Sequence, residues 1–248
     1  MMKTSDFTLG YDLDEWNYYG EKMPIVTDIT PPLNSNALIC GMAGSGKTYF
    51  QTQLFARLVK AEPSGEFYFA DYKRDDAFAH LRGCTRYYPY KQTLDALDAV
   101  YSRMNARMSG EDETRNPVTL IWDEYFANIL SLMNEDKKKA EEVMRKVGVI
   151  LMDGRSMSIR LITSCQNPYA KAFADGSKIN YGMIIVLGAF KRSVYETALL
   201  EHIDEVKGRE FSRGEGSVWL EQSGLHFIKV PQVRDIEGMN DLCVSALS

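Results

Sequence analysis

The chain has 248 residues, of which 45% are hydrophobic and 25% charged, and this average composition excludes a disordered chain, a collagen-like fibre and a coiled-coil rod. No apolar run approaches the roughly 18 residues of a membrane span, and the start lacks a signal layout, so we expect a cytoplasmic protein without direct membrane insertion. The net charge of −5 does not favour a nucleic-acid partner, because such proteins usually carry a basic surface. The four cysteines are scattered without a C-x-x-C pair, which argues against zinc and against disulfides.

The predicted elements alternate between strands and helices. A polar lead-in over residues 1–35 precedes the domain that we expect over residues 36–248. Apolar runs predict strands, helical spacing predicts helices, and a turn at Ser223-Gly224 predicts a hairpin. The strands are expected at 37–40, 67–70, 118–122, 159–165, 183–187, 218–222 and 225–230, and the helices at about 47–60, 94–108 and 140–151. This order predicts an α/β fold with a doubly wound, mostly parallel central sheet flanked by helices and a C-terminal β-hairpin.

The segment after the first of these strands carries a phosphate-binding motif. Residues 41–48 satisfy G-x-x-x-x-G-K-[ST], in which glycines let backbone N–H groups converge on phosphate oxygens at a helix N-terminus. Lys47 would hold the β- and γ-phosphates of ATP, and Thr48 would bind Mg²⁺. A chance match in a glycine-rich turn is the alternative, but the strand before the loop and the helix after it are what the motif demands. The predicted nucleotide-binding residues are Gly41, Met42, Ala43, Gly44, Ser45, Gly46, Lys47, Thr48 and Tyr49.

Two carboxylates follow the apolar run 118–122. Asp123, at the carboxyl end of a buried strand, is placed to hold Mg²⁺ at the nucleotide site. Glu124 is placed to activate the attacking water, which points to hydrolysis rather than to a kinase. Adjacent acids at a strand end also occur in ordinary solvated turns, but the phosphate-binding motif upstream makes the catalytic interpretation the better one.

A glutamine ends the strand expected at 159–165. Gln166 is placed to contact the γ-phosphate or the attacking water and to report hydrolysis to the rest of the subunit. A strand-terminal glutamine that caps a loop is an equally good interpretation of the chemistry alone.

Four segments resemble the motor domain of the FtsK/HerA superfamily of ring-forming DNA-translocating ATPases, and most closely its FtsK/SpoIIIE branch, which includes coupling proteins of conjugative elements. The lead-in 9–12 with the first strand and its loop is similar to that family's entry into the motor. Asp71-Tyr72-Lys73 resembles its D-P-K element, with Tyr72 in place of proline. Residues 154–168 resemble G-R-x-x-G-I-H-L-x-x-A-T-Q-R-P, and residues 214–219 resemble its late G-x-G-x-hydrophobic step.

The resemblance implies a RecA-like P-loop NTPase domain that uses ATP and Mg²⁺, forms a homo-oligomeric ring, expected to be a hexamer, and acts on double-stranded DNA. Asn167 stands where the family usually has arginine, and Ser158 replaces a common glycine. Eighteen residues, 231–248, follow Val230, too few for a winged-helix DNA-reading domain. We therefore expect that a membrane anchor, a relaxase or another recruitment protein supplies anchoring and orientation, if they are needed.

Ring ATPases of this kind use an arginine from one subunit to complete the neighbour's site. Arg155, in the matched segment, is the first candidate, followed by Arg192 and Arg213. The segment from Lys171 to Lys178, with Asp175 and Gly176 between them, is the candidate for DNA contact, and an ordinary surface loop is its alternative.

Two further groups have simpler interpretations. The lysine run 137–139 is interpreted as a solvated helix face among acidic residues. The aromatic segment 87–90 is interpreted as core or interface rather than a base-stacking surface.

The sequence therefore predicts an ATP-hydrolysing DNA translocase in chromosome handling or in mobile-element transfer. Two rival hypotheses keep the nucleotide site: an ATPase that energises protein secretion, which the acidic charge favours, and a nucleotide-gated assembly factor that barely hydrolyses.

Overall fold

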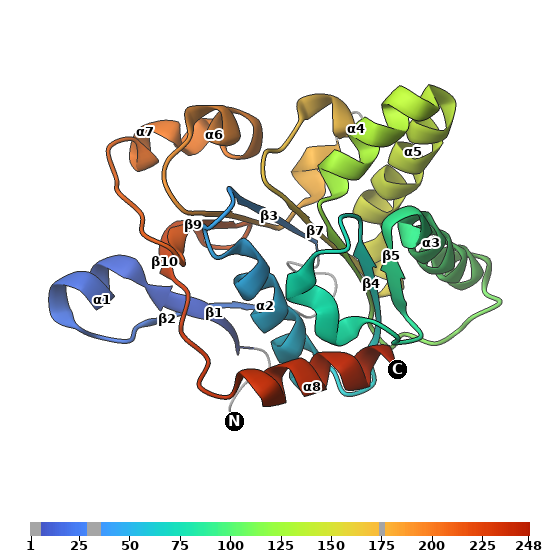
Figure 1. Cartoon of the computed structure of the whole chain (residues 1–248), viewed down its shortest axis with the longest axis horizontal. Coiled ribbons are helices and arrows are strands. Elements are labelled where there is room, and N and C mark those ends of the chain that lie inside the picture. The colour runs from blue at the N-terminus through green and yellow to red at the C-terminus, as the bar shows by residue number, and fades with distance from the viewer. Residues whose placement is uncertain (1–5, 29–35, 174–176) are drawn as a thin grey trace.

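Within the part of the chain that the structure describes, ten strands form one continuous sheet (Figure 1). The computed structural model describes residues 6–28, 36–173 and 177–248. The order of the strands is β2-β1-β10-β9-β8-β3-β7-β6-β4-β5. Within the described residues the strands are β1 (Asp6–Asp12), β2 (Pro24–Asp28), β3 (Ala37–Gly41), β4 (Glu66–Asp71), β5 (Tyr87–Pro89), β6 (Val118–Asp123), β7 (Ile159–Cys165), β8 (Met183–Leu187), β9 (Glu215–Leu220) and β10 (Gly224–Lys229).

The sheet has a parallel half and an antiparallel half. Strands β5, β4, β6, β7, β3 and β8 pair in parallel, whereas β8, β9, β10, β1 and β2 pair antiparallel. The helices among the described residues are α1 (Leu13–Tyr19), α2 (Lys47–Ala61), α3 (Thr93–Ser109), α4 (Tyr125–Glu135), α5 (Lys137–Asp153), α6 (Arg192–Ala198), α7 (Ile203–Val206) and α8 (Ile236–Leu247). The predicted fold class, an α/β domain with a large, mostly parallel sheet between helices, is confirmed.

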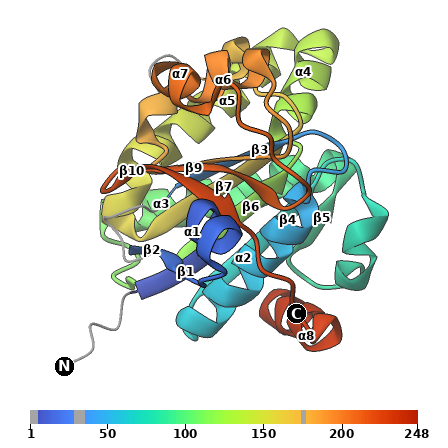
Figure 2. The same ribbon diagram turned by 90° about the vertical axis from the view of Figure 1, so that its left-hand side faces the viewer.

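Helices cover both faces of the parallel half, which explains why its strands are apolar without alternation. In β3, Leu38 and Cys40 pack with α3, α4 and α5 on one face, while Ala37 and Ile39 pack with α2 and α8 on the other. Figure 2 shows α2 and α8 on one side of the sheet and α4, α5 and α6 on the other. Each strand of this half therefore contributes to two hydrophobic cores.

The N-terminal strands extend the antiparallel half of the sheet. Strand β1 pairs with β10, where Tyr11 stands opposite Lys229, and Leu9 of β1 is completely buried. The Arg57 guanidinium of α2 donates hydrogen bonds to the carbonyl oxygens of Thr8 and Leu9 at 2.7 and 2.9 Å. The described part of the lead-in thus packs against the domain. The expected boundary at residue 35 lies outside the described residues and stays a prediction.

The element boundaries follow the sequence with small differences. Helix α2 ends one residue later than expected, and β4 gains a residue at each end. The hairpin turns earlier than expected, because Leu220 already pairs with Gly224, whose φ of 80° suits a glycine. In the part of the chain that the structure describes, no helix is both long and apolar enough to cross a membrane.

Candidate nucleotide-binding and catalytic site

The carboxyl ends of the parallel strands bring the predicted site residues, except Arg155, to one edge of the sheet. Residues 41–46 join β3 to α2, and β3 lies between β7 and β8. Asp71 and Asp123 are register partners at the ends of β4 and β6. Cys40 and Cys165 are likewise partners in β3 and β7, so the phosphate loop and Gln166 follow neighbouring positions. Ligands of open α/β sheets bind at this edge, where the strand order reverses.

The phosphate loop, residues 41–48, has the backbone of an anion cradle. Gly44 and Gly46 have φ values of 83° and 95°, a backbone conformation that residues with a side chain rarely adopt. A Cβ on Gly188 would lie 2.7 Å from the Ser45 Cβ, and the Gly214 N–H donates to the Ser45 carbonyl oxygen at 2.8 Å. Helix α2 begins without a side-chain cap. The loop is therefore held from beneath while the start of α2 stays available for an anion.

A pocket of about 240 Å³ opens above this loop. Every predicted nucleotide-binding residue lines it except Gly41 and Ser45, which lie in the supporting part of the loop. Glu124 and Gln166 line it as well, so the structure brings together three separate sequence signals. The lining residues are Met42, Ala43, Gly44, Gly46, Lys47, Thr48, Tyr49, Asp75, Glu124, Gln166 and Arg213.

Lys47 is the centre of a buried ion cluster. Its Nζ lies 3.2 Å from Asp123 Oδ1, 2.9 Å from Glu124 Oε1 and 3.4 Å from Ser164 Oγ. Burial alone would lower the pKa of Lys47, but Asp123 and Glu124 together raise it above its ordinary value. Lys47 is therefore a cation at the floor of the pocket, which is the charge that a phosphate requires.

Ser164 links the carboxylate of Asp123 to the backbone of Glu124. Its hydroxyl donates to Asp123 Oδ1 and accepts the backbone N–H of Glu124 at 3.4 Å. Burial raises the pKa of Asp123, and the opposing effect of Lys47 and Ser164 only limits the rise. Glu124 has left-handed backbone angles, φ 54° and ψ 38°, which mark a strained position of the kind found at functional sites. The sequence analysis did not assign Ser164 a role, although it lies two residues before Gln166 in the matched segment.

Lys73 is a second cation beside Glu124. Its Nζ lies 3.4 Å from Glu124 Oε2, and its side chain is 40% exposed. Asp71, two residues earlier, accepts hydrogen bonds from the Tyr87 hydroxyl at 2.7 Å and from the Asp75 N–H at 3.2 Å. The resemblance drew attention to residues 71–73 without giving them a role, and their contacts with the site depend on the pairing of β4 with β6.

The three candidate arginines lie in different places. Arg213 lines the chain's own nucleotide pocket. Arg155 lies before β7, at the opposite edge of the sheet, where its Nη1 is 3.4 Å from Glu221 Oε2. Arg192 is exposed and pairs with Glu196 on α6 at 2.8 Å. Arg155 and Arg192 therefore do not line this chain's nucleotide pocket, and their role stays a prediction.

The oxygen donors at the site fit Mg²⁺. Mg²⁺ binds through one or two protein oxygens together with phosphate oxygens and water. The Thr48 hydroxyl and the Asp123 carboxylate are such donors, at the start of α2 and the end of β6. Across residues 6–28, 36–173 and 177–248 there is no group of three or more His, Cys, Asp or Glu side chains arranged for a metal. The protein therefore offers part of a coordination shell, which a nucleotide would complete.

The candidate DNA segment is only partly described. Lys171 is exposed, and Lys178 is half-buried, so that burial lowers its pKa. Asp175 and Gly176 lie outside the described residues.

The lysine run 137–139 and the aromatic segment 87–90 differ in their exposure to solvent. The lysines at 137–139 are exposed at the start of α5. In the aromatic segment, Tyr87 and Tyr88 pack inward, whereas Tyr90 is 51% exposed and stacks on Tyr72.

The chain is similar to FtsK-type proteins in sequence. No family model matches it. It is 26% identical over 174 residues to the FtsK domain-containing protein YdcQ of Bacillus subtilis (strain 168). The similar region covers 64% of this chain and 35% of that protein, so the chain spans about a third of this curated relative.

The fold is also that of several solved ATPases. The pCW3 conjugation coupling protein TcpA superposes with a TM-score of 0.72 and 16% identity over 99% of this chain and 71% of that one. The cytoplasmic domain of the type VII secretion ATPase EccC from Thermomonospora curvata superposes with a TM-score of 0.67 and 17% identity over 99% of this chain and 31% of that one. With its phosphate loop, acid pair and parallel sheet, the chain is similar in sequence to an FtsK domain-containing protein and has the fold of P-loop ATPases.

Proposed function

We propose that this chain is an ATP- and Mg²⁺-dependent motor of the FtsK/HerA type, which assembles into a hexameric ring in the cytoplasm and translocates double-stranded DNA. The observation that carries the proposal is the cluster of Lys47, Asp123, Glu124 and Ser164 beside the phosphate loop. A kinase would keep water from the γ-phosphate, whereas a glutamate beside the phosphate-binding lysine favours hydrolysis.

The chain's own residues would divide the hydrolysis among them. Lys47 leaves the two carboxylates and binds the β- and γ-phosphates, while Thr48 and Asp123 hold Mg²⁺, which neutralises phosphate charge when it is bound. Glu124, no longer held by Lys47, accepts a proton from water as the water oxygen attacks the γ-phosphorus. The bond from that phosphorus to the bridging oxygen breaks, and ADP and phosphate leave. Gln166 orients the water or senses the γ-phosphate.

The two lysine contacts of Glu124 suggest how hydrolysis depends on whether a nucleotide is bound. In the structure, Glu124 is held by Lys47 at 2.9 Å and by Lys73 at 3.4 Å. A glutamate with both oxygens paired has neither oxygen placed to accept the proton of a water molecule. An incoming phosphate would compete for Lys47 and leave Glu124 Oε1 free for water, while Lys73 remains beside Oε2. We therefore propose that nucleotide binding itself prepares the catalytic base.

Assembly into a ring would complete the site. Arg155 is proposed to reach the γ-phosphate of the neighbouring subunit, and Arg192 is the next candidate. Arg213, which lines this chain's pocket, is proposed to act on its own nucleotide. The coupling protein TcpA was solved with ATPγS, which supports nucleotide binding by this fold. A recruitment protein, such as a relaxase or a membrane anchor, is proposed to bring the ring to its DNA.

An ATPase assay with and without a DNA duplex tests the function, together with electron microscopy of the protein with a non-hydrolysable ATP analogue and the duplex. We expect rings around DNA, turnover stimulated by DNA, and affinity that falls steeply with salt and depends little on sequence. A strict monomer whose turnover ignores DNA contradicts the proposal. Stimulation by a polypeptide instead of DNA would favour a secretion motor, and a vanishing rate that Glu124→Gln leaves unchanged would favour an assembly factor.

A further inference from the structure

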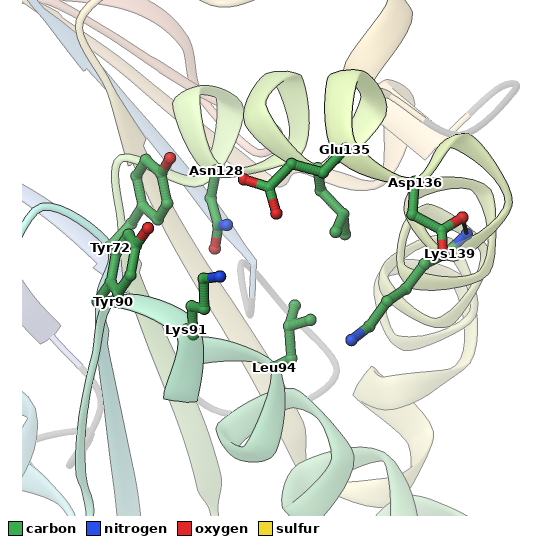
Figure 3. A pocket seen from close by; sticks show the side chains of 9 residues that line it. Tyr72, Tyr90, Lys91, Leu94, Asn128, Glu135, Asp136 and Lys139 are labelled. Atoms are coloured by element: carbon green, nitrogen blue, oxygen red, sulfur yellow. Dashed lines mark hydrogen bonds between the residues drawn. The ribbon is translucent and has the colours of Figure 1, made fainter.

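A second pocket lies beside the catalytic site, between the end of the sheet and helices α3, α4 and α5. It has a volume of about 340 Å³, within the range of small-ligand sites. Figure 3 shows Tyr72 and Tyr90 along one wall, Asn128 and Glu135 reaching in from α4, and the Lys91 amine nearby. We call it the tyrosine pocket; its lining residues are Tyr72, Tyr90, Lys91, Leu94, Asn128, Leu132, Glu135, Asp136 and Lys139.

The aromatic wall suits a planar ligand. The rings of Tyr72 and Tyr90 stack with their centroids 6.1 Å apart and an angle of 27° between their planes. Tyr90 is 51% exposed, and its backbone has a positive φ of 52°. Tyrosine rarely adopts this conformation, so the local structure holds the ring against its backbone preference. The exposed part of the Tyr90 ring is therefore accessible to a stacking partner.

Asn128 supplies an unused polar group inside the pocket. Asn128 is only 7% exposed. The Thr93 hydroxyl lies 2.7 Å from Asn128 Oδ1 and fixes the amide. Within the described residues Nδ2 has no hydrogen-bond acceptor, and Figure 3 shows the amide pointing into the pocket. Among the described residues, Nδ2 is not one of the fully buried atoms that lack a partner, so it faces the open pocket and can donate to a ligand acceptor there.

The carboxylates and the lysines of the pocket differ in how far they are satisfied. Glu135 accepts from the Ser131 hydroxyl at 3.3 Å, and Asp136 caps α5 through the Lys139 N–H at 3.1 Å. In contrast, Lys91 contacts only the Tyr90 ring, at 5.8 Å, and neither it nor Lys139 has a carboxylate within ion-pair distance among the described residues. The free groups are therefore two amines, an amide donor and an aromatic face.

We propose that the tyrosine pocket binds one nucleoside phosphate, either free or as the end of a nucleic-acid strand. The base stacks on Tyr90. Its edge, where every base has neighbouring acceptors and donors, pairs with Asn128 Nδ2 and Glu135. Lys91 and Lys139 contact the phosphate. Because the tyrosine pocket shares no lining residue with the pocket at the phosphate loop and the proposed ligand needs no triphosphate, this site is separate from the proposed ATP site.

The test uses 5-iodo-deoxycytidine 5′-monophosphate and a 12-nucleotide strand that carries the same base at its 5′ end. Irradiation attaches the iodinated base to an aromatic ring on which it stacks, and mass spectrometry identifies the peptide. We expect attachment to Tyr90 or Tyr72, whereas a nucleotide at the phosphate loop would mark Tyr49. Attachment of the free nucleotide alone would indicate a free nucleoside phosphate as the ligand. Attachment of the strand as well would indicate that the pocket also accepts the end of a nucleic acid.

Calorimetric titration of dCMP, without ATP, measures the affinity. Tyr90→Ala should weaken binding about five-fold or more, because a base loses its stacking partner, and Tyr90→Phe should retain it. For the strand, Lys139→Ala should reduce the slope of log affinity against log salt by about 0.7. Lys138→Ala is the matched control, since Lys138 is the adjacent exposed lysine and does not line the pocket.

Three results overturn the proposal: no attachment at either tyrosine, equal effects of Lys139→Ala and Lys138→Ala, or equal binding of dCMP and of deoxyribose 5-phosphate, which has no base. None of these readouts involves ATP turnover. The proposal for the tyrosine pocket can therefore be refuted while the motor proposal stands, and the motor proposal can be refuted while the pocket proposal stands.

Discussion

Glu124→Gln separates nucleotide binding from hydrolysis more sharply than any other change at this site. The carboxylate of Glu124 holds the Lys47 amine at 2.9 Å and the Lys73 amine at 3.4 Å, and its side chain is 6% exposed. The substitution keeps the size of the side chain and removes one negative charge. The cluster of two lysines and two acids is then left with one excess positive charge beside the phosphate loop.

The two consequences have opposite directions. Turnover should fall about 100- to 10,000-fold, because the water loses its general base. ATP should bind about five-fold tighter, equivalent to about 1 kcal/mol, because the phosphate no longer competes with Glu124 for Lys47. The gain is smaller than the value of a fully buried charged hydrogen bond, because the amide oxygen of the substituted side chain can still accept a hydrogen bond from the Lys47 amine.

Titration with a fluorescent ATP analogue and a phosphate-release assay measure the two effects on the same preparation. Glu142→Gln is the matched control, because it removes the same charge from an exposed acid on α5, whose partner is Lys146. It should change neither quantity. Unchanged turnover in Glu124→Gln would refute the role of Glu124 as the base, and weaker ATP binding would refute the competition for Lys47.

Three further predictions concern stability and the support of the phosphate loop. Gly188→Ala should weaken nucleotide binding, because its Cβ would lie 2.7 Å from the Ser45 Cβ. Gly208→Ala is the control, since Gly208 has a similar φ of 87° but open space around it. This control should cost the same roughly 1 kcal/mol of backbone strain without affecting binding in the same titration. Arg160→Met should lower the free energy of unfolding by about 3–5 kcal/mol, because buried Glu62 loses its pair at 2.8 and 2.9 Å, and Glu62→Leu in the double variant should recover part of this loss in urea denaturation. The Glu215→Gln variant should be less stable than the unchanged protein at neutral pH. Burial alone would raise the pKa of Glu215, but a lysine on the neighbouring strand and a backbone N–H together lower this pKa below 4.5. The difference in the free energy of unfolding between the two proteins should therefore shrink as the pH falls below 4.5, and a constant difference would contradict this.

The local elements of the site are determined by the sequence alone. The phosphate loop, the acid pair after the run 118–122 and Gln166 after the run 159–165 could each be predicted, because a buried parallel strand is an uninterrupted apolar run and the polar residues that follow it stand at its carboxyl end. Since all parallel strands end at one edge, the sequence also predicts that these three signals share a site.

Only the tertiary structure decided which distant residues complete that site. Lys73 reaches Glu124 because β4 pairs with β6 in the register that aligns Asp71 with Asp123. Arg213 lines the pocket because the chain before β9 passes beside the phosphate loop, where Gly214 bonds to Ser45.

The same holds for the lead-in and the tyrosine pocket. Strands β1 and β2 extend the sheet beside β10, and the tyrosine pocket forms where α4 and α5 meet the end of β5. Strand pairing and helix docking join segments many residues apart, and the periodicity of each segment contains no information about its partner.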